Sequence, residues 1–269
     1  KMINMMYLVF IAMLALNIGK EVLATLGILN NDLQNSITEL EASSAANYAQ
    51  IESNANSADY MIAASQVLDM KKEADEFFNL VQKIKDSLII GEDGVANKYL
   101  KEVNVKGTDS VITITAYQEM DKSQVLDEYF FEGDMLTAKG QEFLDKYQSF
   151  PTAVTKILET IVFMEEEAKI ARTALDGSKG EDGVQIEYDF ASSKNDLKNR
   201  FNYTPQVINS EGTFQEFLSY NFYGFPVVAS LAKLTKIQAD IRYIENKVLT
   251  EILSAIQGKG LNFSTFQTL

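Results

Sequence analysis

The sequence predicts a mainly α fold, in which a single transmembrane helix is followed by an elongated helical bundle on one side of the membrane. Three observations lead to this prediction. Residues 2–18 are uncharged and mostly apolar, the remainder is acidic, and long stretches repeat apolar residues every three or four positions. We therefore expect the transmembrane helix over residues 1–27 and the bundle over residues 28–269, with at most a small β element.

The run from Met2 to Ile18 contains only two strongly polar side chains, Asn4 and Asn17. As a helix it would span roughly 26 Å, close to the ~30 Å hydrocarbon core of a bilayer. Lys20 and Glu21 follow where the membrane edge is expected, and a lysine there can extend its ammonium group to the lipid headgroups.

Two other interpretations of this run are a signal peptide and a buried core helix. The apolar part of a signal peptide is usually about 7–15 residues long and ends at a cleavage site of small residues. Ala24-Thr25-Leu26 does not provide such a site. A retained membrane helix is therefore the favoured interpretation.

The distribution of charge predicts the orientation in the membrane. The chain has a formal net charge of −14, and only Lys1 precedes the apolar run. Because Lys and Arg favour the cytoplasmic side, we expect a cytoplasmic N-terminus and an exported C-terminal domain. The acidic balance argues against nucleic acid as a partner.

The composition also argues against enzymatic chemistry. There is no cysteine and no histidine, so disulfides, thiol chemistry, the commonest general base and the commonest metal ligand are all missing. No phosphate-binding loop or nucleophile elbow occurs. Glu165–Glu167 is expected to be a solvated helix face, and Asp176–Gly183 lacks the spacing of a calcium loop. We expect no catalytic, cofactor or metal site.

Apolar periodicity places the elements in chain order. A polar helix continues from the membrane through residues 29–57, and the composition of residues 54–59 predicts a turn. A second helix to Ile90 would form an antiparallel hairpin with the first. The further expected elements are a lone strand at Val111–Ala116, helices at 135–147 and from Pro151 to Leu175, a surface turn at 176–183, and short helices at 192–201 and 213–223.

The last helix is predicted from Pro226 to Gly258. Its apolar stripe requires a partner helix along its length. The residues expected to pack the bundle include Leu231, Leu234, Ile237, Ile241 and Ile244.

The polar residues of the membrane helix are the candidate functional residues. Asn4 and Tyr7 lie three positions apart and share a helix face, which Asn17 extends loosely. We expect this face to contact a partner or an aqueous path, although interfacial anchoring of Tyr7 and Asn17 is an alternative. Because the run has no carboxylate and Glu21 lies too near the edge, the proton-binding acid of any proton-driven machine would belong to another subunit.

Two blocks of the sequence match a known family in order and spacing. They are K-M-I-N-M-M-Y-L-V-F-I-A-M-L-A-L-N at 1–17 with K-E-V-L at 20–23, and P-V-V-A-S-L-A-K-L-T-K-I-Q-A-D-I-R-Y-I-E-N-K-V-L at 226–249. They resemble the GldM/PorM family, the periplasm-spanning motor subunits of gliding motility and type IX secretion in Bacteroidota. The resemblance covers the whole chain, with residues 28–269 as the first periplasmic domain.

The resemblance implies a single-pass protein of the bacterial inner membrane whose bulk is periplasmic. It implies a homodimer whose membrane helices lie inside a ring of five copies of the partner GldL/PorL. Proton flow would drive rotation, which the periplasmic part passes to outer-membrane gliding and secretion components. Asn4, Tyr7, Asn17 and Lys20 match the family's polar positions, whereas Gly19 stands where Ser is common.

The resemblance also leads us to expect further residues at both ends. An intramembrane Arg of the family would lie upstream of Lys1, and later periplasmic domains would follow the apolar tail at 261–269.

Two other classes of protein remain as alternatives. A sensory receptor also places a helical bundle above a membrane helix, but it should show a second membrane segment and a signalling region. A stator of the peptidoglycan-binding or energy-transducing kind should carry an Asp in its membrane helix, which residues 2–18 lack.

Overall fold

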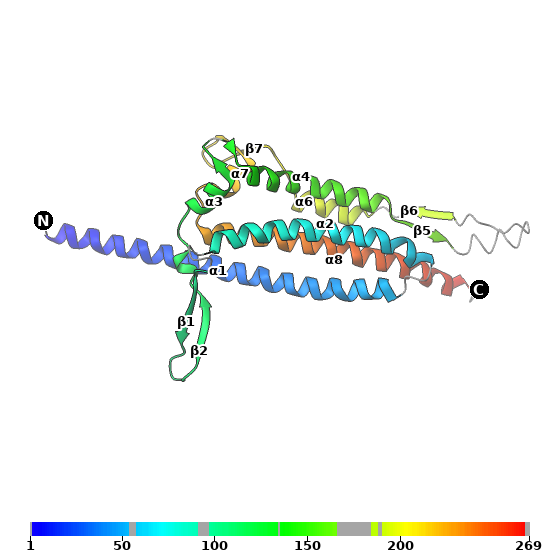
Figure 1. Cartoon of the computed structure of the whole chain (residues 1–269), viewed down its shortest axis with the longest axis horizontal. Coiled ribbons are helices and arrows are strands. Elements are labelled where there is room, and N and C mark those ends of the chain that lie inside the picture. Colours follow the sequence, from blue (N-terminus) through cyan, green and yellow to red (C-terminus); the bar gives the residue numbers. More distant parts are fainter. Residues whose placement is uncertain are drawn as a thin grey trace, which may run out of the picture. The chain divides into compact units, whose positions relative to one another are not determined.

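Long helices make up most of the molecule (Figure 1). The computed structural model describes the backbone of residues 2–53, 58–90, 97–133, 135–165, 184–187 and 190–266. It describes the side chains of residues 19–53, 66–90, 97–133, 135–161 and 190–255.

Helices and short strands alternate along the chain. The helices are α1 (Met2–Ser53), α2 (Ala58–Ile89), the 3-10 helix η1 (Tyr117–Glu119), α3 (Gln124–Phe130), α4 (Ala138–Glu159), α6 (Ala191–Arg200), α7 (Phe217–Phe222) and α8 (Val227–Phe266). The strands form antiparallel pairs, which are β1 (Leu100–Asn104) with β2 (Val111–Thr115), β3 (Phe131–Glu132) with β4 (Met135–Leu136), β5 (Val162–Glu165) with β6 (Val184–Glu187), and β7 (Gln206–Ile208) with β8 (Phe214–Glu216).

The chain divides into two compact units, each assembled from three separate segments. Unit 1 comprises Lys1–Ser36, Asn79–Leu144 and Tyr203–Ala239. Unit 2 comprises Ile37–Phe78, Asp145–Asn202 and Asp240–Leu269. Each of the four long helices, α1, α2, α4 and α8, contributes one segment to each unit.

Three buried phenylalanines from three helices form the aromatic centre of unit 1. The ring centroid of Phe130 in α3 lies 5.3 Å from that of Phe143 in α4 and 5.5 Å from that of Phe222 in α7. Such ring pairs contribute about 0.5–1.5 kcal/mol each beyond the burial of their surface. This cluster fixes the short helices α3 and α7 on the first turns of α4.

Unit 2 has an aromatic cluster of its own. The ring of Phe77 in α2 lies 5.4 Å from that of Phe150 in α4, and the Phe150 ring lies 5.0 Å from that of Phe201. Tyr147 adds a further contact with Phe201 at 5.7 Å. The cluster joins α2 and α4 to the end of α6.

The mainly α fold and the first two helices confirm the sequence prediction. α1 continues without a break from Met2 to Ser53, and α2 ends at Ile89, one residue before the predicted end. Residues 54–57 of the predicted turn lie outside the described residues.

The prediction that a helix starts at Pro151 is wrong, because Pro151 lies inside α4. An interior proline removes one backbone hydrogen bond and costs about 3 kcal/mol. Burial outweighs this cost: Phe150, Val154 and Leu158 follow one face of α4 and are at most 1% exposed. The predicted extension of this helix to Leu175 is also wrong, because α4 ends at Glu159 and residues 162–165 form strand β5. The β-branched and aromatic residues Val162 and Phe163 favour a strand there.

The structure contains more β structure than the sequence predicts. The strand expected near Val111 is present as β2, but it pairs with β1 and is not alone. Helices expected from Met135 and Thr213 begin later, at Ala138 and Phe217, because β4 and β8 precede them. The expected turn at 176–183 lies outside the described residues.

The helix predicted at Ser192–Phe201 is confirmed as α6, within one residue at each end. The last helix begins as predicted, but its predicted end at Gly258 is wrong, because α8 continues to Phe266. A glycine inside a helix costs only about 1 kcal/mol relative to alanine and does not by itself end one.

Candidate functional site

The polar residues expected in the membrane helix all fall within α1. The side chains of Asn4, Tyr7 and Asn17 lie outside the described residues, whereas those of Lys20 and Glu21 are exposed. Within the part of the chain that the structure describes, no helix combines the length and the apolar character needed to cross a membrane.

The five residues expected to pack the bundle all lie in α8. The structure buries Leu231 and Leu234 in unit 1, and it buries Ile241 and Ile244 in unit 2. Ile237 is half-buried. Polar side chains lie between these apolar residues, and two of them, Thr235 and Arg242, belong to polar clusters that reach other helices.

The first cluster lies in unit 1 and fastens α1 to η1 and α8. The Tyr117 hydroxyl donates a hydrogen bond to Asn31 Oδ1 at 2.5 Å and accepts one from Asn30 Nδ2 at 3.3 Å. Thr235 Oγ1 donates to Asn30 Oδ1 at 2.7 Å. We call Gly27, Asn30, Asn31, Tyr117 and Thr235 the Tyr117 cluster.

Gly27 allows the Tyr117 ring to lie directly on the backbone of α1. A Cβ atom at position 27 would lie 2.2 Å from ring carbons of Tyr117, much closer than any van der Waals contact. Asn30 is 5% exposed and Thr235 is fully buried, so their mutual hydrogen bond also satisfies groups that water does not reach. The cluster therefore fixes both the distance and the rotation of α1 in unit 1.

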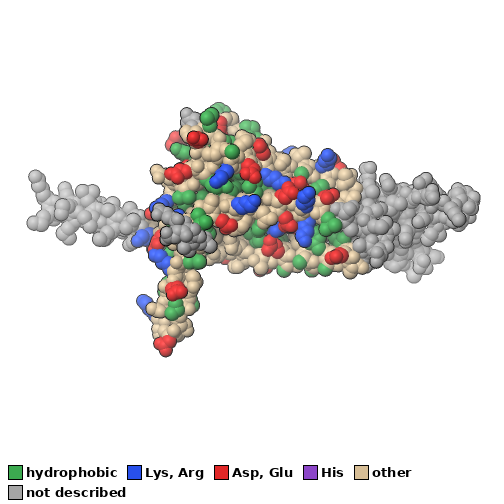
Figure 2. Space-filling view, in the orientation of Figure 1, with side chains coloured by type: hydrophobic (Ala, Val, Ile, Leu, Met, Phe, Trp, Pro, Cys, Tyr) green, Lys and Arg blue, Asp and Glu red, His purple; other side chains and the backbone are tan. Residues whose placement is uncertain are grey.

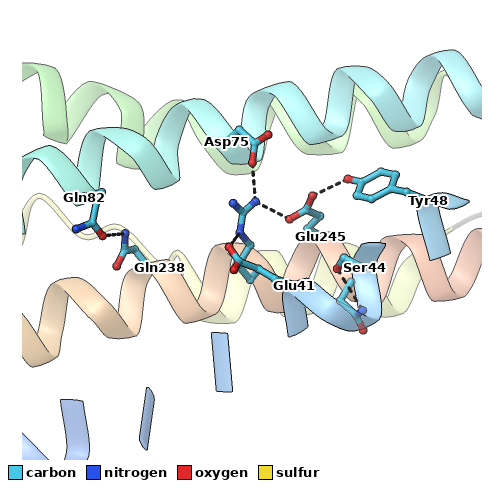
Figure 3. Close-up of polar contacts among 9 residues, drawn as sticks. Glu41, Ser44, Tyr48, Asp75, Gln82, Gln238 and Glu245 are labelled. Atoms are coloured by element: carbon cyan, nitrogen blue, oxygen red, sulfur yellow. Dashed lines mark hydrogen bonds and ion pairs between the residues drawn. The ribbon is translucent and has the colours of Figure 1, made fainter. Parts of the chain in front are cut away.

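A second polar contact of unit 1 joins α2 to α8. Lys85 Nζ donates a hydrogen bond to Gln238 Oε1 at 2.7 Å. Gln238 Nε2 donates one to Gln82 Oε1 at 3.0 Å (Figure 3). Lys85 is only 4% exposed. Burial lowers the pKa of Lys85 from 10.5 to about 8, against a smaller opposing effect of Asp86.

The second cluster lies in unit 2 and centres on Arg242 of α8. Arg242 Nε donates to Glu41 Oε1 of α1 at 3.0 Å, and Nη1 donates to Asp75 Oδ1 of α2 at 2.8 Å (Figure 3). Nη1 also donates to Glu245 Oε2 at 2.8 Å, and the Tyr48 hydroxyl donates to Glu245 Oε1 at 2.6 Å. These five residues are the Arg242 network.

The Arg242 network brings charges together in a largely buried place. The Arg242 side chain is 11% exposed and that of Glu245 is 3% exposed, whereas Glu41 and Asp75 reach the surface. Burial alone would lower the pKa of Arg242, but Glu245 and Asp75 outweigh it and raise the pKa. Burial, followed by the Glu245 carboxylate, raises the pKa of Tyr48. Both residues therefore keep their protons at neutral pH.

Both clusters tie helices together, and neither has the form of a reaction centre. The three carboxylates of the Arg242 network are all bonded to one arginine, and the Tyr117 cluster is uncharged. Among the described residues, no group of three or more His, Cys, Asp or Glu side chains is placed to hold a metal ion.

Sequence reasoning missed both clusters, although each left a trace. Arg242 lies next to Ile241 of the predicted apolar stripe, where a charged side chain needs an ionic partner. Gly27 lies inside a helix, where glycine is unfavourable unless a neighbour needs the space. The identity of that neighbour, Tyr117, could not be inferred from a local pattern.

Helices that are joined by such interior polar contacts, as they are within each unit, are typical of a structural component. The family model of the GldM N-terminal domain matches residues 21–255, and the chain belongs to this family. The family assignment drawn from the two sequence blocks is therefore confirmed, although most of the first block precedes the matched residues. The family is a component of gliding motility and type IX secretion and is not a known enzyme family. A search of curated proteins finds no match for the chain.

Proposed function

We propose that this chain is the force-transmitting subunit of a motor driven by the proton motive force in the bacterial inner membrane. Residues 1–27 form its single membrane helix, with the N-terminus in the cytoplasm and the bulk of the chain in the periplasm. Two copies place their membrane helices inside a ring of a multi-span GldL/PorL-type subunit. Motion of these helices passes through the periplasmic part to the gliding and secretion machinery at the outer membrane.

The observation that carries this proposal is the way in which α1 enters unit 1. α1 has no break between Met2 and the Tyr117 cluster. Rotation of its N-terminal part about the helix axis therefore rotates the whole helix. The Tyr117 ring on Gly27 and the Asn30–Thr235 hydrogen bond then oppose rotation of α1 against η1 and α8. A passive tether would need neither feature.

The proposed partner face of the membrane helix consists of Asn4, Tyr7, Asn17 and Lys20. Amide and phenol groups in a membrane are stabilised by hydrogen bonds to other helices or to water. The partner subunit supplies the proton-binding carboxylate, because residues 2–18 contain none.

An insertion between Glu21 and Val22 tests force transmission. About seven alanine-rich residues add two helical turns and keep α1 continuous and nearly in phase, whereas seven glycine and serine residues make it flexible. We expect the helical insertion to retain gliding or secretion and the flexible insertion to abolish it. Both variants should be present at normal levels and should co-purify the multi-span partner in excess.

Full activity of the flexible variant would show that α1 is only a tether. Recovery of the unmodified chain as a lone monomer from detergent would contradict the proposed motor.

Tyr7→Phe and Asn17→Leu test the proposed partner face of the membrane helix. In the same assays of motility or secretion, both variants should be impaired at normal protein levels. Unchanged function in both would mean that this helix is only an anchor.

A further inference from the structure

The β1–β2 hairpin exposes apolar side chains that neither cluster uses (Figure 2). Val111, Ile112 and Ile114 of β2 keep 55%, 48% and 42% of their surface exposed. A two-stranded sheet is only marginally stable alone in water, and adjoining exposed apolar side chains indicate an interaction surface. Figure 1 shows the hairpin projecting from the helices of unit 1.

The two edges of this hairpin differ in chemistry. β2 reads V-I-T-I-T, with a β-branched side chain at every position and neither charge nor proline. β1 carries Lys101 and Glu102. Natural edge strands usually carry charges, proline or a bulge that prevent pairing with another chain. The edge of β2 has none of these, and among the described residues β2 pairs only with β1.

The register shows which backbone groups lie at this open edge. The hydrogen bonds at the two ends of the hairpin are both 2.9 Å long and run from Val105 N to Ser110 O and from Ala116 N to Tyr99 O. Bonded residues alternate along an antiparallel strand, so the even-numbered residues of β2 direct their N–H and C=O groups to β1. Those of Val111, Thr113 and Thr115 point outward.

We propose that β2 pairs antiparallel with β2 of a second copy of this chain, about a twofold axis at Thr113. This register sets Thr113 against Thr113 of the partner copy and Val111 against its Thr115, so that the outward backbone groups of all three residues are bonded. It sets Ile112 against Ile114 of the partner copy, which joins the apolar side chains on one face. The result is a four-stranded sheet shared by the two copies.

The balance of charge favours a second copy as the occupant of this edge. Two chains of net charge −14 repel one another, but residues 100–115 carry two lysines, one glutamate and one aspartate and are neutral overall. β2 itself brings no charge opposite its own copy. A pairing of five residues is smaller than the roughly 1,200–2,000 Å² of a stable interface, so it adds to other contacts of the dimer. This inference rests on the dimer of the proposed function, and it assigns the β2 edge to the interface of that dimer.

Cysteine cross-linking of the full chain in membranes tests this pairing directly, because the chain has no cysteine of its own. The Cα atoms of a bonded antiparallel pair lie about 5.5 Å apart, within the roughly 4.4–6.8 Å range that a disulfide spans. Mild oxidation should therefore shift Thr113→Cys to the dimer band on a non-reducing gel. Glu102→Cys, central in β1, and Thr108→Cys, in the connecting turn, are matched controls that should remain monomeric.

Equal cross-linking of either control would overturn the assignment of the β2 edge, and so would a disulfide between Thr113→Cys and a different protein. A monomeric Thr113→Cys band, with a detergent complex whose mass shows two copies, would reject this surface and leave the proposed dimer intact. A complex that contains a single copy would reject both.

Discussion

Arg242 and Glu245 lie largely buried in unit 2, and Arg242 is bonded to three carboxylates from α1, α2 and α8. Removing one partner of a buried ion pair leaves an uncompensated charge, which typically costs about 3–5 kcal/mol. We expect Arg242→Met to lower the free energy of unfolding by about 3 kcal/mol in urea denaturation. The double variant Arg242→Met/Glu245→Leu should recover most of this loss.

The exposed pair of Lys101 with Glu119 provides the control for this experiment. Both of its side chains are about half exposed, and such pairs contribute about 0–1 kcal/mol. Lys101→Met should therefore change stability little. An equal loss in Lys101→Met and Arg242→Met would contradict the role assigned to burial.

Lys85 makes the free energy of unfolding depend on pH in the alkaline range. Its pKa is about 8 in the folded chain and 10.5 ordinarily, so between these values the unfolded chain holds a proton that the folded chain has released. The free energy of unfolding contributed by this group therefore rises with pH over that window, by about 3 kcal/mol in total. Lys85→Met should abolish the rise between pH 7.5 and 10 in urea denaturation.

The difference between the stability curves of the unmodified chain and Lys85→Met isolates Lys85, because every other ionisable group is common to both proteins. Lys83→Met, on the exposed side of the same helix, should retain the rise. If Lys85→Met kept the full rise as well, Lys85 would not be its source.

At the scale of the element, α1 contains two glycines, one with free space around it and one covered by a neighbouring ring. An added Cβ at Gly19 would meet nothing within 4 Å, whereas at Gly27 it would meet the Tyr117 ring at 2.2 Å. Gly19→Ala should therefore stabilise the chain by up to about 1 kcal/mol, through helix propensity alone. Gly27→Ala should destabilise it, because the ring must move and strain its hydrogen bonds.

A double-mutant cycle tests the cause of that loss. In a Tyr117→Ala background the ring is absent, so Gly27→Ala should raise the free energy of unfolding as Gly19→Ala does. A Gly27→Ala variant as stable as Gly19→Ala in the presence of Tyr117 would mean that the ring does not hold α1.

At the scale of the whole molecule, the sequence predicted what depends on local pattern. Periodicity correctly placed α1, α2 and the start of α8, because their apolar residues recur every three or four positions. It failed at Pro151, where burial of neighbouring side chains overrode a local rule. It also missed β1, because L-K-E-V-N has no clear alternation of apolar and polar residues.

The candidate site was less accessible to prediction than the fold. Asn4, Tyr7 and Asn17 stand out in the sequence because polar groups are rare in an apolar run, and their role stays a prediction. Tyr117 was not identified, because its partners on α1 and α8 are distant in sequence. The family resemblance suggests the role that we propose for the chain, and the structure supplies the contacts through which we propose that force travels.

Because each unit is assembled from three separate segments, the order in which the segments are synthesised limits when each unit can fold. Unit 1 requires residues from α1 and from α8, and so does unit 2. While the chain is being made, α1 and α2 are therefore complete long before the helix that buries their polar side chains exists. Contacts this distant in sequence close slowly, and neither unit can close until α8 has been synthesised. A chain exported as it is made would have to be kept from aggregation until its last helix arrived.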